Sequence, residues 1–271
     1  MSGEFALFAA ALAVAGLFAG FIGGLFGVGG GIVLVPALYH VFGLLGVPDE
    51  VRMHAAVATS LSTILATSWR SLSTHAKSGA VDFALLRVWT PWIALGAAGG
   101  ALVAGLSSDE TLLIVFGVGM LLIALQMGFG RDEWRLARDV PTGWPRNIIA
   151  AIIGALSAMM GIGGGTWGVL MMTLSGRTIH QAVATASGFG AAIAIPAALV
   201  NVFTGWRAPG LPPFSAGYVN LIGFVLLALL TMLTAPYGAR LAHRLDRAIL
   251  KRAFAIFLAL NALNLLREAF T

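Results

Sequence analysis

Gly20-Phe21-Ile22-Gly23-Gly24-Leu25-Phe26-Gly27-Val28-Gly29-Gly30-Gly31-Ile32-Val33-Leu34-Val35-Pro36 organises the rest of this sequence. It places a dense run of glycines inside an apolar segment. Its core returns in the second half of the chain as Gly161-Ile162-Gly163-Gly164-Gly165. A broken apolar helix in matching places of two halves is typical of a transport site near the middle of a membrane.

Composition predicts an all-α polytopic membrane protein. Hydrophobic residues make up 59% of the 271 residues and charged residues only 10%, whereas about a quarter of an ordinary soluble domain is charged. A soluble domain of this length cannot bury so much apolar surface. Several apolar runs, such as 83–106, 112–129 and 218–237, are long enough to cross a lipid bilayer.

The internal repeat extends beyond the glycines. Residues 54–60, His-Ala-Ala-Val-Ala-Thr-Ser, match residues 180–186, His-Gln-Ala-Val-Ala-Thr-Ala. Each half therefore reads as a glycine hairpin followed by three transmembrane helices. We predict a first transmembrane repeat over 1–130, a polar linker over 131–145 and a second transmembrane repeat over 146–271.

The distribution of Lys and Arg predicts that the two repeats are inverted. These residues favour the cytoplasmic side of a membrane. The segment 106–111 has no Lys or Arg, whereas its counterpart over 240–252 is rich in both. The linker is then cytoplasmic and both termini are periplasmic. Inversion also requires each glycine segment to return to the side from which it entered, so we expect two re-entrant hairpins with their tips near the midplane.

The glycine tips are the predicted substrate site. Each tip would place a helix N-terminus and unpaired backbone N–H groups inside the membrane, where an anion is a good partner. The alternative for any single glycine is close helix packing. For the duplicated unit we favour a substrate-binding role, which we assign to Gly27, Gly29, Gly30, Gly31, Gly161, Gly163, Gly164 and Gly165.

Small hydroxyls on the helices after the tips are expected to complete this site. A hydroxyl donates to an anion without placing a charge in lipid. We assign this role to Thr59, Ser60, Thr185 and Ser187. The alternative is that each hydroxyl bonds to a carbonyl of its own helix.

Three further residues of the second half are included as substrate-binding candidates. Thr166 and Trp167 directly follow the second tip, although packing is an equal alternative for the Trp. Asn201 either lines the pathway or caps a helix end. For His75, the matching residue of the first half, we expect a place at the cytoplasmic boundary.

Acidic residues are absent from the middle of the predicted spans. Four acidic residues outside the linker fall near the ends of predicted helices: Asp82, Asp109, Asp246 and Glu268. This argues against a cation channel or a carboxylate proton pump. His54 and His180 begin helices on opposite faces, too far apart for one metal site. We expect no enzyme activity, no catalytic residue, no metal and no cofactor.

Two further classes are excluded by composition. The chain has no Cys, so disulfides and thiol chemistry are absent. Its Arg residues are scattered between apolar runs, and so we expect no nucleic-acid partner.

The doubled Gly-x-Gly-Gly-Gly, the following Val35-Pro36 and the segment 54–60 resemble the TauE/SafE family, also called TSUP, of sulfite and organosulfonate exporters. The resemblance spans nearly the whole chain. It implies transport of small sulfur-containing anions across the bacterial inner membrane. It places the conserved patches of the family on 27–31, Thr59, Ser60, 161–165 and Thr185. This sequence departs from its own first repeat at Ala186, which stands where the first half has Ser60.

We therefore expect a multi-pass secondary transporter, an exporter of sulfite, a sulfonate or a sulfonated carboxylate, that works by alternating access. The alternatives are a passive anion channel and a membrane-embedded sulfur-trafficking partner without transport of its own. The identity of the anion, the direction of transport, any coupling ion and assembly into a homo-oligomer stay open.

Overall fold

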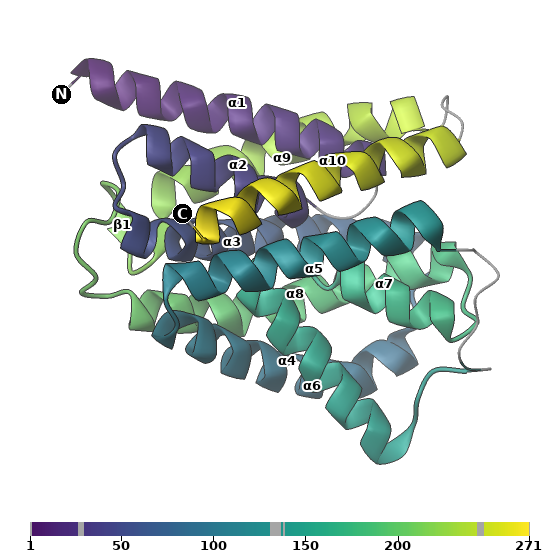
Figure 1. Ribbon diagram of the computed structural model, residues 1–271. Coiled ribbons are helices and arrows are strands. Elements are labelled where there is room, and N and C mark those ends of the chain that lie inside the picture. The colour runs from purple at the N-terminus through teal and green to yellow at the C-terminus, as the bar shows by residue number, and fades with distance from the viewer. Residues whose placement is uncertain (1, 27–29, 131–136, 138, 243–246, 271) are drawn as a thin grey trace.

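The computed structural model describes the backbone of residues 2–26, 30–130, 137, 139–242 and 247–270. These residues form ten helices and one short antiparallel hairpin, so the expected all-α architecture is confirmed (Figure 1). The first half contains α1 (Ser2–Phe26), α2 (Gly31–Leu44), α3 (Asp49–Lys77), α4 (Phe83–Leu106) and α5 (Asp109–Phe129). The second half contains α6 (Gly143–Met159), α7 (Gly165–Leu174), α8 (Ile179–Thr204), β1 (Ser215–Ala216), β2 (Val219–Asn220), α9 (Leu221–Ala242) and α10 (Arg247–Ala269).

Five helices among the described residues are long and apolar enough to cross a membrane: Leu7–Leu25 of α1, α4, α5, α8 and Leu221–Gly238 of α9. Their outward faces carry exposed aliphatic side chains, such as Leu102, Leu122 and Leu229. Lipid is the solvent that such faces require, because water would leave this apolar surface unburied.

The connections between helices gather at two ends of the molecule (Figure 1). The end that we call the termini end holds both chain ends, the α2–α3 and α4–α5 turns and the β1–β2 hairpin. The other end, which we call the linker end, holds the α3–α4 and α7–α8 turns and the start of α6. The α1–α2 pair begins and finishes at the termini end, whereas the α6–α7 pair begins and finishes at the linker end. The placement of these two hairpins in a bilayer stays a prediction.

The two halves interlock through glycines. Helix α1 packs against α9 of the other half, and α6 packs in the same way against α4. A Cβ atom at Gly20 would lie 2.5 Å from the Thr231 Cα, and one at Gly154 would lie 2.1 Å from the Ile93 carbonyl oxygen. Both helix pairs therefore approach to a distance that only glycine permits. Neither half can form its packed core without the other.

Helices α3 and α8 pack against each other in the centre of the molecule. Every residue of α3 from Met53 to Ile64 is buried. This segment is rich in Ala, Ser and Thr, whose small side chains allow neighbours to surround it on all sides.

Two matching threonines attach these central helices to the starts of α9 and α4. The Thr59 hydroxyl accepts from the Asn220 backbone N–H at 3.0 Å, and the Thr185 hydroxyl accepts from the Asp82 backbone N–H at the same distance. Asn220 and Asp82 in turn cap their helices through side-chain oxygens. The same hydrogen bond, from a capping residue to a threonine hydroxyl, therefore fixes one long helix of each half onto a central helix of the other.

The Gly161 backbone lies in the left-handed region at φ +62°, and a Cβ atom there would lie 2.9 Å from the Val57 Cα. We expect Gly161→Ala to lose about 1–3 kcal/mol of stability, because strain and overlap add. Thermal unfolding in detergent measures this loss. Gly99→Ala is the matched control, since a Cβ atom there meets nothing within 4 Å. An equal melting temperature for the two variants would contradict the assignment.

Thr59→Val and Thr185→Val remove the acceptor of a backbone N–H and keep the shape of the side chain. Each change should lower the unfolding free energy by about 1–3 kcal/mol, because it leaves a donor without a partner. Thr59→Ser and Thr185→Ser retain the acceptor and should stay close to the wild type. Loss of stability in the Ser variants that equals the loss in the Val variants would show that packing, not the hydrogen bond, matters here.

Candidate functional site

The two glycine segments meet at the centre of the molecule. A Cβ atom at Gly31 would lie 2.7 Å from the Gly161 carbonyl oxygen, so the start of α2 touches the second tip directly. Ser60 of α3 donates its hydroxyl to the same oxygen at 2.8 Å. The Ser60 bond gives a buried carbonyl of the broken helix a partner, which lipid cannot supply.

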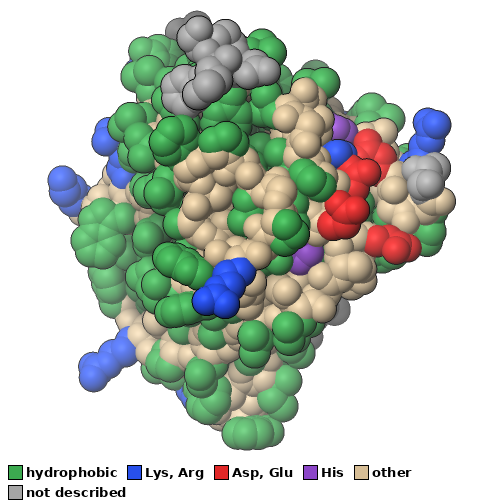
Figure 2. All heavy atoms as spheres, turned by 90° about the vertical axis from the view of Figure 1, so that its left-hand side faces the viewer, with side chains coloured by type: hydrophobic (Ala, Val, Ile, Leu, Met, Phe, Trp, Pro, Cys, Tyr) green, Lys and Arg blue, Asp and Glu red, His purple; other side chains and the backbone are tan. Residues whose placement is uncertain are grey.

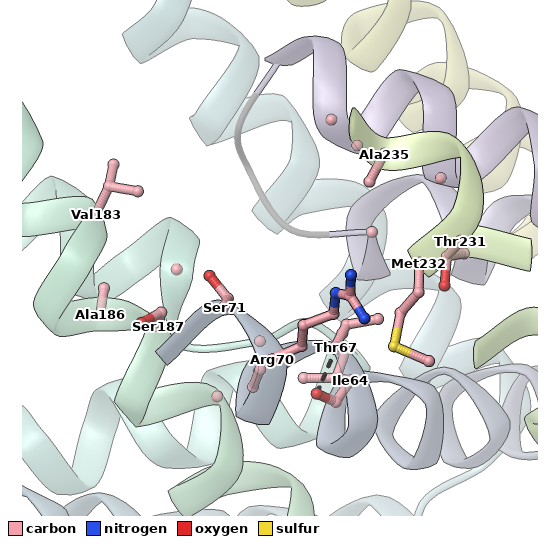
Figure 3. A pocket seen from close by; sticks show the side chains of 18 of the residues that line it. Ile64, Thr67, Arg70, Ser71, Val183, Ala186, Ser187, Thr231, Met232 and Ala235 are labelled. Atoms are coloured by element: carbon pink, nitrogen blue, oxygen red, sulfur yellow. Dashed lines mark hydrogen bonds between the residues drawn. The ribbon is translucent and has the colours of Figure 1, made fainter. Parts of the chain in front are cut away.

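A cavity of about 460 Å³ lies beside this meeting point. It is enclosed by glycines of both tips, the second half of α3, the first half of α8 and the ends of α1 and α9 (Figure 3). The polar and ionisable side chains that line it are Thr67, Ser68, Arg70, Ser71, Thr74, His75, Ser187 and Thr231. The apolar ones include Leu34, Ile64, Val169, Val183 and Met232.

The charge balance of the cavity wall is positive. Arg70 extends from α3 into the space between α3 and α9 (Figure 3). Within the described part of the chain, no acidic side chain pairs with it, and no acidic residue lines the cavity. The wall therefore offers a cation and several hydroxyls with no competing carboxylate.

Two helix N-termini add to this positive character. Gly30 and Gly164 are the N-cap residues of α2 and α7, and neither helix has a side-chain cap. Both glycines line the cavity. A helix N-terminus carries a partial positive charge and uncapped N–H groups, which together favour an anion.

In the part of the chain that the structure describes, the cavity reaches one end of the molecule. Its lining residues Arg70 and Thr74 are exposed and lie close to the linker end. Toward the termini end, the fully buried stretch of α3 from Met53 to Ile64 closes the path. A ligand in the cavity would therefore exchange with the linker side alone.

Five of the residues chosen from the sequence line this cavity: Gly30, Gly163, Gly164, Gly165 and Ser187. Gly31, Ser60 and Gly161 form the contact between the tips. Gly27 and Gly29 lie outside the described residues.

The other predicted site residues lie away from the cavity wall. Thr59 and Thr185 bind the starts of α9 and α4, as described above. Thr166 is buried, and the Trp167 indole N–H is buried without a hydrogen-bond partner among the described residues. The Asn201 side chain donates to the Ala197 carbonyl of its own helix at 2.9 Å, near the end of α8.

Arg70 and His75 are the functional candidates that sequence reasoning missed. The sequence indicates no site role for Arg70 and predicts a place at the cytoplasmic boundary for His75, yet both line the cavity. A signal was present in the sequence. Ser60, Thr67, Ser71 and Thr74 recur at helical spacing along α3 and so define one polar stripe that includes Arg70.

Comparisons with known proteins agree with this architecture. A family model described as sulfite exporter TauE/SafE matches residues 12–265. A "probable membrane transporter protein" of Haemophilus influenzae is 30% identical over 250 residues, which cover 92% of this chain and 95% of that protein. A protein of the same description from Methanocaldococcus jannaschii is 26% identical, with 94% and 93% covered.

A third relative, from Bacillus subtilis and also described as a probable membrane transporter protein, is 26% identical over 87% of this chain and 88% of its own. The family match over residues 12–265 includes both glycine segments and the helices that enclose the cavity. The chain belongs to the sulfite exporter TauE/SafE family of membrane transporters.

Proposed function

We propose that this protein is a secondary transporter that exports small sulfur-containing anions, such as sulfite, a sulfonate or a sulfonated carboxylate, across the bacterial inner membrane. The observation that carries the proposal is the cavity beside the two glycine tips, whose described wall contains Arg70 and no acidic residue. The choice of sulfite rests on the family, and the choice of an anion rests on the chemistry of the cavity wall.

The site holds its ligand by three kinds of donor. The Arg70 guanidinium is a planar fork that matches the oxygens of a sulfonate or carboxylate. The uncapped starts of α2 and α7 offer backbone N–H groups, and Ser68 and Ser71 make no hydrogen bond to other described residues, so their hydroxyls are available. The apolar wall around Ile64 and Met232 suits the carbon skeleton of an organic sulfonate.

The distribution of charge supports export. Most described Lys and Arg side chains lie at or near the linker end, among them Lys77, Arg87, Arg146, Arg177, Arg240, Lys251 and Arg252. Acidic side chains gather at the termini end, which faces the viewer in Figure 2. Because positive residues favour the cytoplasm, the cavity would face the cytoplasm and both termini the periplasm.

Alternating access follows from this one-sided cavity. The ligand enters from the linker end, and release requires the buried part of α3 to open toward the termini end. The membrane potential favours this direction by about 2.3 kcal/mol per charge per 100 mV, since the cell interior is negative. No enzymatic step is needed.

Arg70→Gln should raise the apparent KM for sulfite or a short organosulfonate about tenfold or more, because a charge-assisted hydrogen bond contributes about 1.5–3 kcal/mol. The effect is measured as uptake of labelled anion into proteoliposomes that are loaded with the unlabelled anion. Arg87→Gln is the control, since Arg87 is an exposed residue of α4 outside the cavity wall. Equal KM values for the two variants would contradict the site.

The same assay separates a transporter from a channel. A transporter shows saturable flux and exchange of labelled anion against unlabelled anion. Flux that rises linearly with concentration would identify a passive anion channel instead, and no flux of any anion would favour a trafficking partner.

A further inference from the structure

A buried pair of ionisable side chains closes the termini end. His54 of α3 and Asp109 at the start of α5 are 4% and 7% exposed, and the His54 Nδ1 atom contacts the Asp109 Oδ1 atom. The Asp109 carboxylate also accepts from the backbone N–H groups of Met53 and His54. The pair thus fixes the first part of α3 to the α4–α5 turn.

The hydrogen bonds of His54 show that this contact contains a proton. The His54 Nε2 atom lies 3.0 Å from the Ala104 carbonyl oxygen. A carbonyl oxygen only accepts, so Nε2 carries a hydrogen. If Nδ1 carried none and Asp109 were ionised, a nitrogen lone pair would face a carboxylate oxygen. The contact is therefore stable only when one proton lies between His54 and Asp109.

Loss of that proton would break one of the two His54 contacts, because a neutral imidazole carries a single N–H; with this N–H on Nε2 and directed at Ala104, the contact with Asp109 is the one lost. It would leave a buried carboxylate that keeps two backbone N–H donors but faces the lone pair of a neutral imidazole, and a buried charge without an opposite charge is costly. Separation of α3 from the α4–α5 turn relieves this cost, because both groups then reach water. Proton binding thus favours the closed termini end, and proton release favours the open one.

Other groups at this end do not replace the pair. The Tyr218 ring stacks on His54 with a centroid distance of 4.7 Å. Burial, and to a smaller extent Asp109, raise the pKa of Tyr218, so its phenol stays neutral. Arg52 is engaged by the Val47 carbonyl and by Asp49. The remaining described charges of this end lie at its surface or in other contacts: Glu50, Glu110, Arg207, Arg267 and Glu268.

The position of the pair connects it to transport. His54 lies on α3 two turns before Ser60, which holds the Gly161 tip. The cavity lies on the other side of that tip and reaches the opposite end of the molecule. The His54–Asp109 contact therefore lies where α3 must separate from the α4–α5 turn before a ligand leaves at the termini end.

We propose that His54 and Asp109 form a proton-binding site that holds the termini end closed, so that release of the proton there accompanies opening. The ligand of this site is a proton, exchanged with the solution at the termini end. The proposal goes beyond anion transport and does not depend on the identity of the anion.

The absence of Cys allows a direct test with single cysteines. Val57→Cys places the reporter one turn from His54 toward the glycine tip, at a residue that is 1% exposed and outside the cavity wall. The rate of labelling by a water-soluble maleimide is measured on the purified full chain from about pH 6 to about pH 9. Ser73→Cys, an exposed residue of α3, supplies the pH dependence of an accessible thiol. Ala97→Cys, buried between α4 and α6, reports general unfolding.

We expect the rate for Val57→Cys, divided by that for Ser73→Cys, to rise with pH by up to about tenfold per pH unit, the limit for one titrating group. His54→Gln and Asp109→Asn keep polar atoms at the site but remove the shared proton, and each should abolish the rise. The rate for Ala97→Cys should stay low throughout.

Three results would overturn the proposal. They are a ratio for Val57→Cys that does not change with pH, a rise that persists in both His54→Gln and Asp109→Asn, and a parallel rise for Ala97→Cys. The first of these needs neither pair variant, so the test holds even where those variants do not fold. No anion is added, so its outcome is independent of whether sulfur anions are the substrate.

Discussion

The structure depends on one constraint, which is that every polar group of a broken backbone must find a partner where lipid offers none. The second glycine segment shows how this constraint is met. The N–H groups of Met160 and Ile162 return to the carbonyls of Leu156 and Ser157, and the Gly161 carbonyl receives the Ser60 hydroxyl. The N–H groups at the start of α7 lie beside a cavity instead. The N–H groups that the broken backbone leaves without a side-chain cap thus lie at the candidate site.

The contact between the halves depends on the same residue types. Close packing of α1 on α9 and of α6 on α4 requires glycine at the crossing points, and the caps at Asp82 and Asn220 require a hydroxyl from the opposite half. Glycines and threonines that the sequence presents as one population therefore have two roles. One role holds helices together, the other surrounds the cavity, and Gly20 has both.

The fold could be predicted from the sequence because its signals are long and periodic. Apolar runs and the breaks at the two glycine cores predicted the helices, while the division into two repeats stays a prediction. The site could be predicted only in part, because the same residue types serve packing and binding. Thr59 and Thr185 match each other as candidate ligands would, yet each accepts the backbone N–H of a residue that caps a helix. Arg70 and His75 were missed because a charge near a helix end has an ordinary explanation. The His54–Asp109 contact joins residues far apart in sequence, and no local pattern indicates it.

The β1–β2 hairpin makes the two ends of the molecule unequal. It inserts between α8 and α9, and it sends Tyr218 onto His54 and Asn220 onto Thr59. The corresponding connection of the first half, between α3 and α4, is a short turn with no such cover. Two halves of identical structure would populate inward-facing and outward-facing shapes equally. In the proposed alternating-access cycle, the extra cover would lower the free energy of only one of these shapes, so the empty protein would rest with its cavity toward the linker side, and an unladen return to that side would be the downhill half of the cycle.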